Sequence, residues 1–146
     1  MGKMMTILLV EDNPDHAELT MKTLSGGKLL NQVFWVQDGA EALDYLWRRN
    51  GYADPEKSPR PGLILLDIKL PKVDGIEVLK QIKSDETLRR IPTVMLTTSE
   101  RDEEMIKSYG LGANSFVTKP VNFGAFVETI KQIELYWVLT NRLLAV

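Results

Sequence analysis

Short apolar segments alternate with longer amphipathic segments along most of this chain. Several of the apolar segments are continuous runs rather than alternating apolar and polar residues, which is typical of strands buried on both faces of a parallel sheet. The strands predicted in this way span residues 6–10, 33–37, 62–66, 93–96 and 115–118.

The segments between these strands have the apolar spacing that one face of a helix requires. In the first of them Ala17, Met21 and Leu24 stand at positions i, i+4 and i+7, and Gly26 and Gly27 provide a stop signal. Because crossovers between parallel strands are right-handed, five strands alternating with five helices predict a doubly wound α/β domain with a five-stranded parallel sheet. The predicted helices span residues 14–25, 40–49, 76–84, 102–111 and about 122–144.

Length and composition agree with one domain of this kind. The 146 residues are 44% hydrophobic and 26% charged, which are ordinary values for a globular chain and argue against disorder. The longest irregular stretch, residues 50–61, is rich in Gly, Asp, Pro and charged residues and is predicted to be a surface loop. We therefore expect a single domain over residues 1–146, with this loop as an insertion.

Charge and cysteine content exclude several classes of function. With 18 basic and 20 acidic residues, the chain lacks the basic surplus of a nucleic-acid-binding surface. It has no cysteine, which excludes disulfides and thiol nucleophiles and is compatible with the cytoplasm. No run approaches the roughly 18 apolar residues of a membrane span. The single histidine, His16, lies in the first turn of a predicted helix, where we expect it to be exposed.

Polar residues of a few chemical kinds stand at the ends of the predicted strands. Glu11 and Asp12 follow the first strand, Asp67 follows the third, Thr97 stands at the end of the fourth and Lys119 at the end of the fifth. Each alone has a plain structural explanation, such as a helix cap or a turn. Because the carboxyl ends of parallel strands share one edge of a sheet, we expect all five side chains to converge there.

Such a convergence has a definite chemistry. Three neighbouring carboxylates repel one another and remain ionised together only with a cation among them. A cluster of hard oxygen ligands with room for water suits Mg²⁺. A lysine and a hydroxyl group beside that ion can contact the oxygens of a phosphoryl group. The pattern therefore predicts a magnesium-dependent site for phosphoryl chemistry.

Four motifs together resemble the signature set of receiver domains, the phosphoacceptor modules of two-component response regulators. They occur in the family's order and strand context, and the resemblance covers residues from about 6 to 134. Any single motif is weak, whereas the combination is highly specific. The motifs are Val10-Glu11-Asp12-Asn13, Leu66-Asp67-Ile68-Lys69-Leu70-Pro71 with Asp74-Gly75, Leu96-Thr97, and Val117-Thr118-Lys119-Pro120.

This resemblance implies a flavodoxin-like fold and a role for each matching residue. Asp67 would accept a phosphoryl group from the phosphohistidine of a sensor histidine kinase. Mg²⁺ would be held by Glu11, Asp12, Asp67 and the backbone carbonyl of Lys69. A receiver of this kind catalyses only its own phosphorylation and dephosphorylation, so it is not expected to be an enzyme in the usual sense.

The resemblance also implies phosphoryl contacts and a switch. Thr97 and Lys119 would bind phosphoryl oxygens, and the peptide bond between Lys119 and Pro120 would be cis. Phosphorylation would draw Thr97 toward the site, and the family's switch aromatic falls on Phe116. Phenylalanine lacks the hydroxyl of the tyrosine common at that position, so it would favour the inward, buried rotamer. The alternative for Phe116 is a plain core residue.

The output of the signal is expected to lie in protein contacts. No effector domain follows the receiver motifs, and the last predicted helix has a second apolar stripe on a different side from its core stripe. This stripe indicates either a homodimer interface or a tail that folds back on its own domain. The loop 50–61 and the long aromatic C-terminus resemble small stand-alone response regulators, some of which serve bacterial or cyanobacterial phytochrome kinases. The stripe comprises Leu135, Tyr136, Leu139 and Leu143.

Two other functions fit parts of the pattern. Magnesium-dependent phosphatases with an aspartyl nucleophile resemble the pattern Asp-x-Asp after the first strand. Here Glu11 and Asp12 occupy that place, and Lys69 stands where the second aspartate after Asp67 would be, which disfavours the phosphatase. A receiver-like scaffold that works without phosphorylation is disfavoured by the intact set of acids together with the threonine and lysine.

Overall fold

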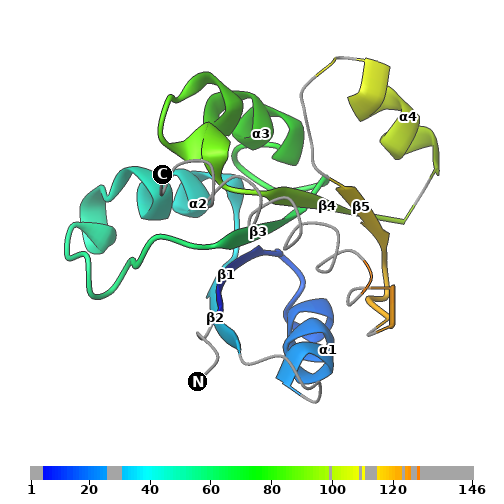
Figure 1. Cartoon of the computed structure of the whole chain (residues 1–146), viewed down its shortest axis with the longest axis horizontal. Coiled ribbons are helices and arrows are strands. Elements are labelled where there is room, and N and C mark those ends of the chain that lie inside the picture. Colours follow the sequence, from blue (N-terminus) through cyan, green and yellow to red (C-terminus); the bar gives the residue numbers. More distant parts are fainter. Residues whose placement is uncertain are drawn as a thin grey trace, which may run out of the picture.

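Five parallel strands form one sheet in the computed structural model, which describes residues 5–25, 31–98, 100–108, 110, 115–122, 124–125 and 128. The strand order is β2-β1-β3-β4-β5, so the predicted doubly wound α/β arrangement is confirmed (Figure 1). The strands are β1 (Met5–Val10), β2 (Asn31–Val36), β3 (Leu63–Asp67), β4 (Thr93–Thr97) and β5 (Ser115–Thr118).

The register of the strands brings their carboxyl ends to one edge of the sheet. Val10, the last residue of β1, pairs with Leu66 of β3, and Asp67 ends β3 one residue later. Thr97, the last residue of β4, pairs with Thr118 at the end of β5. The residues that end or directly follow these four strands therefore lie along the same edge, as the sequence predicts.

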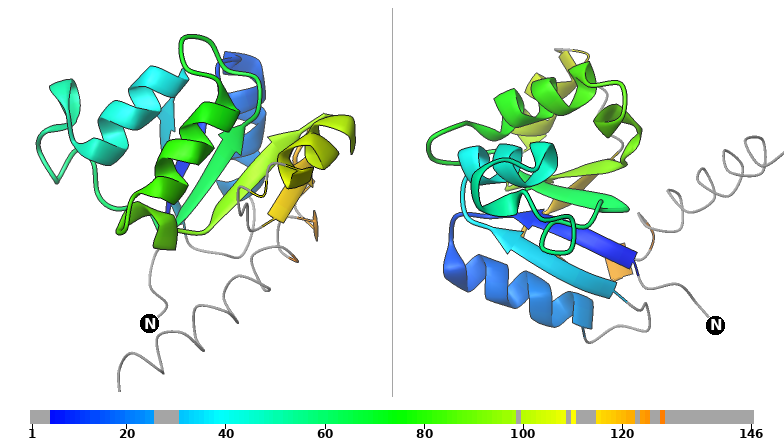
Figure 2. Two further views of the ribbon diagram at one scale, coloured as in Figure 1. Left: turned by 90° about the horizontal axis from the view of Figure 1, so that it is seen from above. Right: turned by 90° about the vertical axis from the view of Figure 1, so that its left-hand side faces the viewer.

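Helices cover both faces of this sheet (Figures 1 and 2). Successive strand residues point to opposite faces, so Ile7 and Leu9 of β1 pack in the cluster that includes the buried residues of α1. Leu8 and Val10 pack in the cluster that includes those of α2 and α3. All four side chains are almost completely buried. The helices are α1 (Pro14–Ser25), α2 (Gly39–Trp47), α3 (Gly75–Ser84) and α4 (Glu100–Ser108).

The ends of several elements differ from the prediction. Helix α2 ends at Trp47 instead of residue 49, because Arg48 adopts a left-handed conformation with φ of 54° and closes the helix. Asp67 is the last residue of β3 and does not follow it. Helix α4 begins at Glu100 and ends at Ser108, whereas the apolar spacing predicts residues 102–111. These shifts leave the order of the elements unchanged.

The segment 50–61 is anchored to α2 and is only partly a surface loop. It begins with a 3-10 helix (Asn50–Tyr52), and the Tyr45 hydroxyl of α2 donates a hydrogen bond to the carbonyl of Pro59 at 2.8 Å. Burial raises the pKa of Tyr45 to about 12, so this hydroxyl remains a donor. The Ser58 hydroxyl is buried and donates to the carbonyl of Tyr52 at 2.9 Å. The predicted exposure is therefore wrong for Ser58.

The predicted homodimer stripe cannot be placed in this fold. Leu135, Tyr136, Leu139 and Leu143, with most of the helix predicted over residues 122–144, lie outside the described residues. Within the described ranges, no helix combines the length and the apolar character that crossing a membrane requires.

The start of α2 depends on a glycine. A Cβ atom on Gly39 would lie 1.8 Å from the carbonyl oxygen of Val73, in the loop between β3 and α3. We expect Gly39→Ala to lower the free energy of unfolding by about 2–3 kcal/mol, because that backbone must move to make room. Urea denaturation measures the change. Gly51→Ala is the matched control, since a Cβ there meets nothing within 4 Å; equal effects of the two substitutions would contradict the packing account.

Candidate metal centre at the carboxyl edge of the sheet

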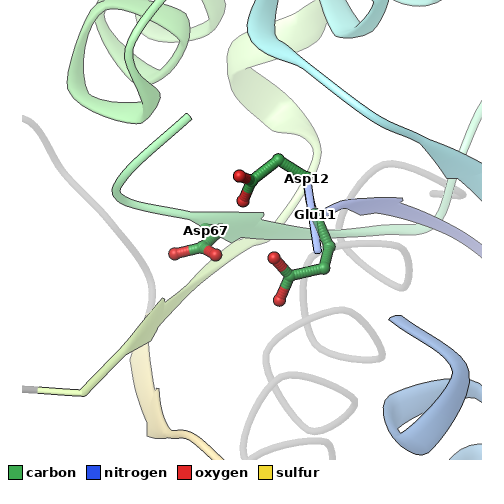
Figure 3. A group of neighbouring side chains, drawn as sticks. All are labelled: Glu11, Asp12 and Asp67. Atoms are coloured by element: carbon green, nitrogen blue, oxygen red, sulfur yellow. The ribbon is translucent and has the colours of Figure 1, made fainter. Parts of the chain in front are cut away.

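Three carboxylates from two strands meet at this edge (Figure 3). Glu11 and Asp12 directly follow β1, and Asp67 ends the neighbouring strand β3. Each contributes one oxygen to a group in which all the oxygens lie within 4.8 Å of one another. Glu11 is 0% exposed and Asp67 is 8% exposed, whereas Asp12 is exposed. The group thus has a buried interior and an open side.

The ammonium group of Lys119 pairs with the two buried acids of the cluster. Its Nζ lies 2.5 Å from Oε1 of Glu11 and 2.9 Å from Oδ2 of Asp67. The Lys119 backbone is held at the edge by its N–H, which donates to the carbonyl of Thr97 at 2.8 Å. The peptide bond between Lys119 and Pro120 is cis, as the resemblance implies. The side chain of Lys119, directly after β5, therefore pairs with acids at the ends of both β1 and β3.

The other predicted site residues are Thr97, Lys69 and Phe116. Thr97 ends β4 and is 3% exposed. The backbone N–H of Lys69 donates to Oδ1 of Asp67 at 3.4 Å, which places that residue beside the acceptor. Phe116 of β5 instead packs against the core, and the Lys107 ammonium of α4 lies 5.4 Å from the centre of its ring. The Phe116 ring therefore lies toward α4.

Burial and pairing set the charges of this cluster. Burial is the main cause that raises the pKa of Glu11 to about 7; Asp67 adds to the rise, whereas hydrogen bonds from Lys119 and the Asn13 backbone oppose it. For Lys119, burial lowers the pKa, but the hydrogen bonds and charges of Glu11 and Asp67 outweigh it, and the net pKa is raised. Lys119 therefore keeps its positive charge at neutral pH, whereas the raised pKa of Glu11 allows this carboxyl group to bind a proton near pH 7.

The donor set fits a hard divalent cation. One ammonium group faces three carboxylates, which leaves an excess of negative charge. All the side-chain donors are carboxylate oxygens, the ligands that Mg²⁺ prefers, and the exposed Asp12 leaves one side open for water. A cation among these oxygens would also favour the ionised form of Glu11. The residues present therefore suit the predicted metal.

Two residues that support the cluster have no role in the prediction, although Asn13 lies in its first motif. Asn13 caps α1, since its Oδ1 accepts hydrogen bonds from the backbone N–H groups of Asp15 at 2.9 Å and His16 at 3.2 Å. The dipeptide Asn13-Pro14 is a recognisable start signal for a helix. Trp35 of β2 donates its indole N–H to the carbonyl of Glu11 at 2.8 Å. No local pattern indicates this second contact.

A cavity opens beside Lys119. It has a volume of about 330 Å³ and is lined by residues of α1, the end of β4 and the chain after β5, among them His16, Leu19, Thr98 and Val121. His16 is exposed, as predicted, with its Nδ1 3.9 Å from Oε1 of Glu11. Leu19 is 50% exposed although it is apolar. The buried ion pairs therefore border a partly apolar surface hollow.

The fold and this cluster define a receiver domain. A family model described as the response regulator receiver domain matches residues 7–131. The chain therefore belongs to the receiver-domain family of two-component response regulators. Receiver domains interact with sensor histidine kinases and are generally not classical enzymes.

Two similar sequences carry different descriptions. The "Probable methanogenesis regulatory protein FilR2" of Methanothrix harundinacea is 43% identical over 136 residues, which are 93% of this chain and 85% of that protein. "Response regulator Rcp1" of Synechocystis is 40% identical over 134 residues, 92% of this chain and 89% of that protein. Both similarities extend over most of the two chains.

Solved structures show the same fold. The "Bacteriophytochrome response regulator RtBRR" is 49% identical, with a TM-score of 0.81 over 88% of this chain and 77% of that chain. The phosphorylated "Cyanobacterial Phytochrome Response Regulator RcpA" is 42% identical, with a TM-score of 0.74 over 94% and 96%. The Mn²⁺-bound form of Rcp1 is 40% identical, with a TM-score of 0.71 over 91% and 94%. The flavodoxin-like receiver fold is thereby confirmed.

The raised pKa of Glu11 predicts a pH dependence of stability without metal. Between its usual pKa of 4.5 and the folded value of about 7, the folded state binds more protons at Glu11 than the unfolded chain does. The contribution of Glu11 to stability therefore falls as pH rises through this interval. We expect Glu11→Gln to be more stabilising at pH 8 than at pH 5. Urea denaturation in EDTA at both pH values measures the difference, and an effect independent of pH would contradict the shift.

Proposed function

We propose that this receiver accepts a phosphoryl group on Asp67 from the phosphohistidine of a sensor histidine kinase, with Mg²⁺ in the acidic cluster. The observation that carries the proposal is the geometry around Asp67. Its carboxylate lies in a group of three acids whose oxygens are within 4.8 Å, and its Oδ2 is 2.9 Å from an ammonium group. The acceptor acid, the other metal ligands and the phosphoryl-binding cation thus lie together at the carboxyl edge of the sheet.

Each residue has a defined task in this reaction. A carboxylate oxygen of Asp67 attacks phosphorus, the bond between phosphorus and the kinase imidazole nitrogen breaks, and the released nitrogen takes up a proton. The product is an acyl phosphate, which water later hydrolyses. Lys119 would leave its ion pair with Asp67 to bind a phosphoryl oxygen, and the Thr97 hydroxyl would bind another.

The metal would be held by Glu11, Asp12, Asp67 and the backbone carbonyl of Lys69. When bound, Mg²⁺ neutralises the negative charge of the transferred group. The Mn²⁺-bound form of Rcp1 supports a divalent cation in this family. The specific proposal of Mg²⁺ depends on the all-oxygen donor set of the three carboxylates.

The partner kinase is proposed to be of the phytochrome type. RtBRR and RcpA, both described as phytochrome response regulators, support this assignment. The name of FilR2 refers to a different process, so identity at this level does not decide the stimulus. The cavity beside Lys119, with the exposed Leu19 at its rim, supports a protein contact next to the reacting groups.

Phosphorylation at the proposed acceptor is directly measurable. We expect acetyl phosphate and Mg²⁺ to add one phosphoryl group to the wild type and none to Asp67→Asn, detected by intact-mass spectrometry. Asp74→Asn is the matched control, because Asp74 precedes α3 and accepts no capping hydrogen bond there. Both the wild type and Asp74→Asn should carry the group.

The same experiment separates the alternatives. Turnover of a phosphate ester without a stable adduct would support an aspartyl-nucleophile phosphatase. Absence of both adduct and turnover, also with an autophosphorylated phytochrome-type kinase as donor, would support a scaffold that works without phosphorylation. An adduct that persists in Asp67→Asn would place the acceptor elsewhere.

We also propose that Thr97 and Phe116 form the switch. The Phe116 ring is half-buried, and the Lys107 ammonium of α4 lies 5.4 Å from its centre. A tyrosine at this position would carry a hydroxyl group, which can form hydrogen bonds at the surface and therefore favours an outward position of the ring. We expect Phe116→Tyr to change the affinity for the kinase about threefold in at least one phosphorylation state, the scale of one hydrogen bond. Calorimetric titration measures both affinities, and unchanged values in both states would remove the switch role.

A further inference from the structure

The backbone of Glu11 is held by strand β2 on both sides of its Cα atom. The Glu11 N–H donates a hydrogen bond to the carbonyl of Val36 at 3.1 Å. The Glu11 carbonyl accepts a hydrogen bond from the Trp35 indole N–H at 2.8 Å. The first contact extends the backbone pairing of β1 and β2 by one residue. The second contact requires a side chain with an N–H donor at position 35.

The register of the strands explains how Trp35 reaches this carbonyl. Trp35 pairs with Leu9, and both side chains belong to the cluster on the α1 face of the sheet. Its indole ring packs at the edge of this apolar cluster and places its N–H beside the carbonyl of Glu11, two residues beyond Leu9. The packing of the Trp35 ring on the α1 face thus positions its N–H for a hydrogen bond at the acidic cluster.

The carbonyl that Trp35 holds belongs to the peptide group that joins Glu11 to Asp12. Fixing this group limits the rotation of the chain between the two acids, whose carboxylates must both face the cluster. Glu11 itself is 0% exposed, so water offers little replacement for a lost donor. The Glu11 carboxylate is held separately, by the backbone N–H of Asn13 at 3.2 Å and by Lys119. The indole is therefore a side-chain constraint on the peptide between the two acids.

We propose that Trp35 is a positioning residue for the divalent cation, acting through the peptide group between Glu11 and Asp12. The proposal rests on the proposed function, in which both acids bind the metal. A phenylalanine in its place keeps an aromatic ring on the α1 face but has no donor. Removing hydrogen bonds that orient metal ligands commonly weakens metal binding about 10- to 100-fold.

The test compares two tryptophan substitutions in the full chain. We expect Trp35→Phe to weaken Mg²⁺ binding about tenfold, measured by calorimetric titration of the folded protein. Trp47→Phe is the matched control, because Trp47 is also half-buried but packs on the other face of the sheet, near Arg49. We expect the control to bind Mg²⁺ like the wild type. A loss of stability in Trp35→Phe with unchanged Mg²⁺ affinity would make Trp35 a packing residue only and overturn the proposal.

A second measurement uses the wild-type protein and does not depend on the folding of the variant. NMR spectroscopy of the indole N–H groups should show that saturating Mg²⁺ shifts the Trp35 signal and slows its exchange with water, while the Trp47 signal stays in place. An unchanged Trp35 signal would contradict the coupling between the indole and the metal site.

The two proposals fail in different ways. Absence of both Mg²⁺ binding and an Asp67 adduct in the wild type would refute the proposed function, and the role of Trp35 with it. Normal Mg²⁺ binding and adduct formation in the wild type, together with full Mg²⁺ affinity in Trp35→Phe, would refute only the role of Trp35. Weaker binding in Trp35→Phe but not in Trp47→Phe supports both.

Discussion

Two buried carboxylates share a single ammonium group, and the arrangement of the site depends on this interaction. Lys119 directly follows β5 and extends past β4 to pair with Asp67 of β3 and Glu11 after β1. Each carboxylate has lost most of its hydration, so removal of the ammonium would leave charge in a poorly solvated place. The charge balance of the site therefore depends on the strand order, which brings Lys119 close to both acids.

A further set of hydrogen bonds holds the backbone around the acids. Asn13 caps α1 with its side chain and donates its own N–H to the carboxylate of Glu11, while β2 holds the Glu11 peptide groups through Val36 and Trp35. Asp12 is exposed at the open side of the cluster. A preorganised set of acids of this kind can receive a cation and a phosphoryl group with little rearrangement.

Much of the fold, and most of the residues that form the site, are predictable from local sequence patterns. Short apolar runs, several of them continuous, indicate all five strands, and the polar residues at the strand ends indicate the three acids and Lys119. Element ends were less predictable, because Arg48 closes α2 through its backbone conformation, which no apolar period encodes. Ser58 was also misplaced, since its burial depends on hydrogen bonds to a folded loop and not on its own polarity.

The sequence by itself determined which chemical groups stand at the carboxyl edge, because strand periodicity and the polar residues after each strand are local properties. Only the tertiary structure decided which of these groups are buried and how they pair. The raised pKa of Glu11 follows from its burial beside Asp67, and the bond from Trp35 to Glu11 joins residues 24 positions apart. Both depend on packing between strands and helices that are distant in the chain, and such packing sets solvation and charge only once the sheet is assembled.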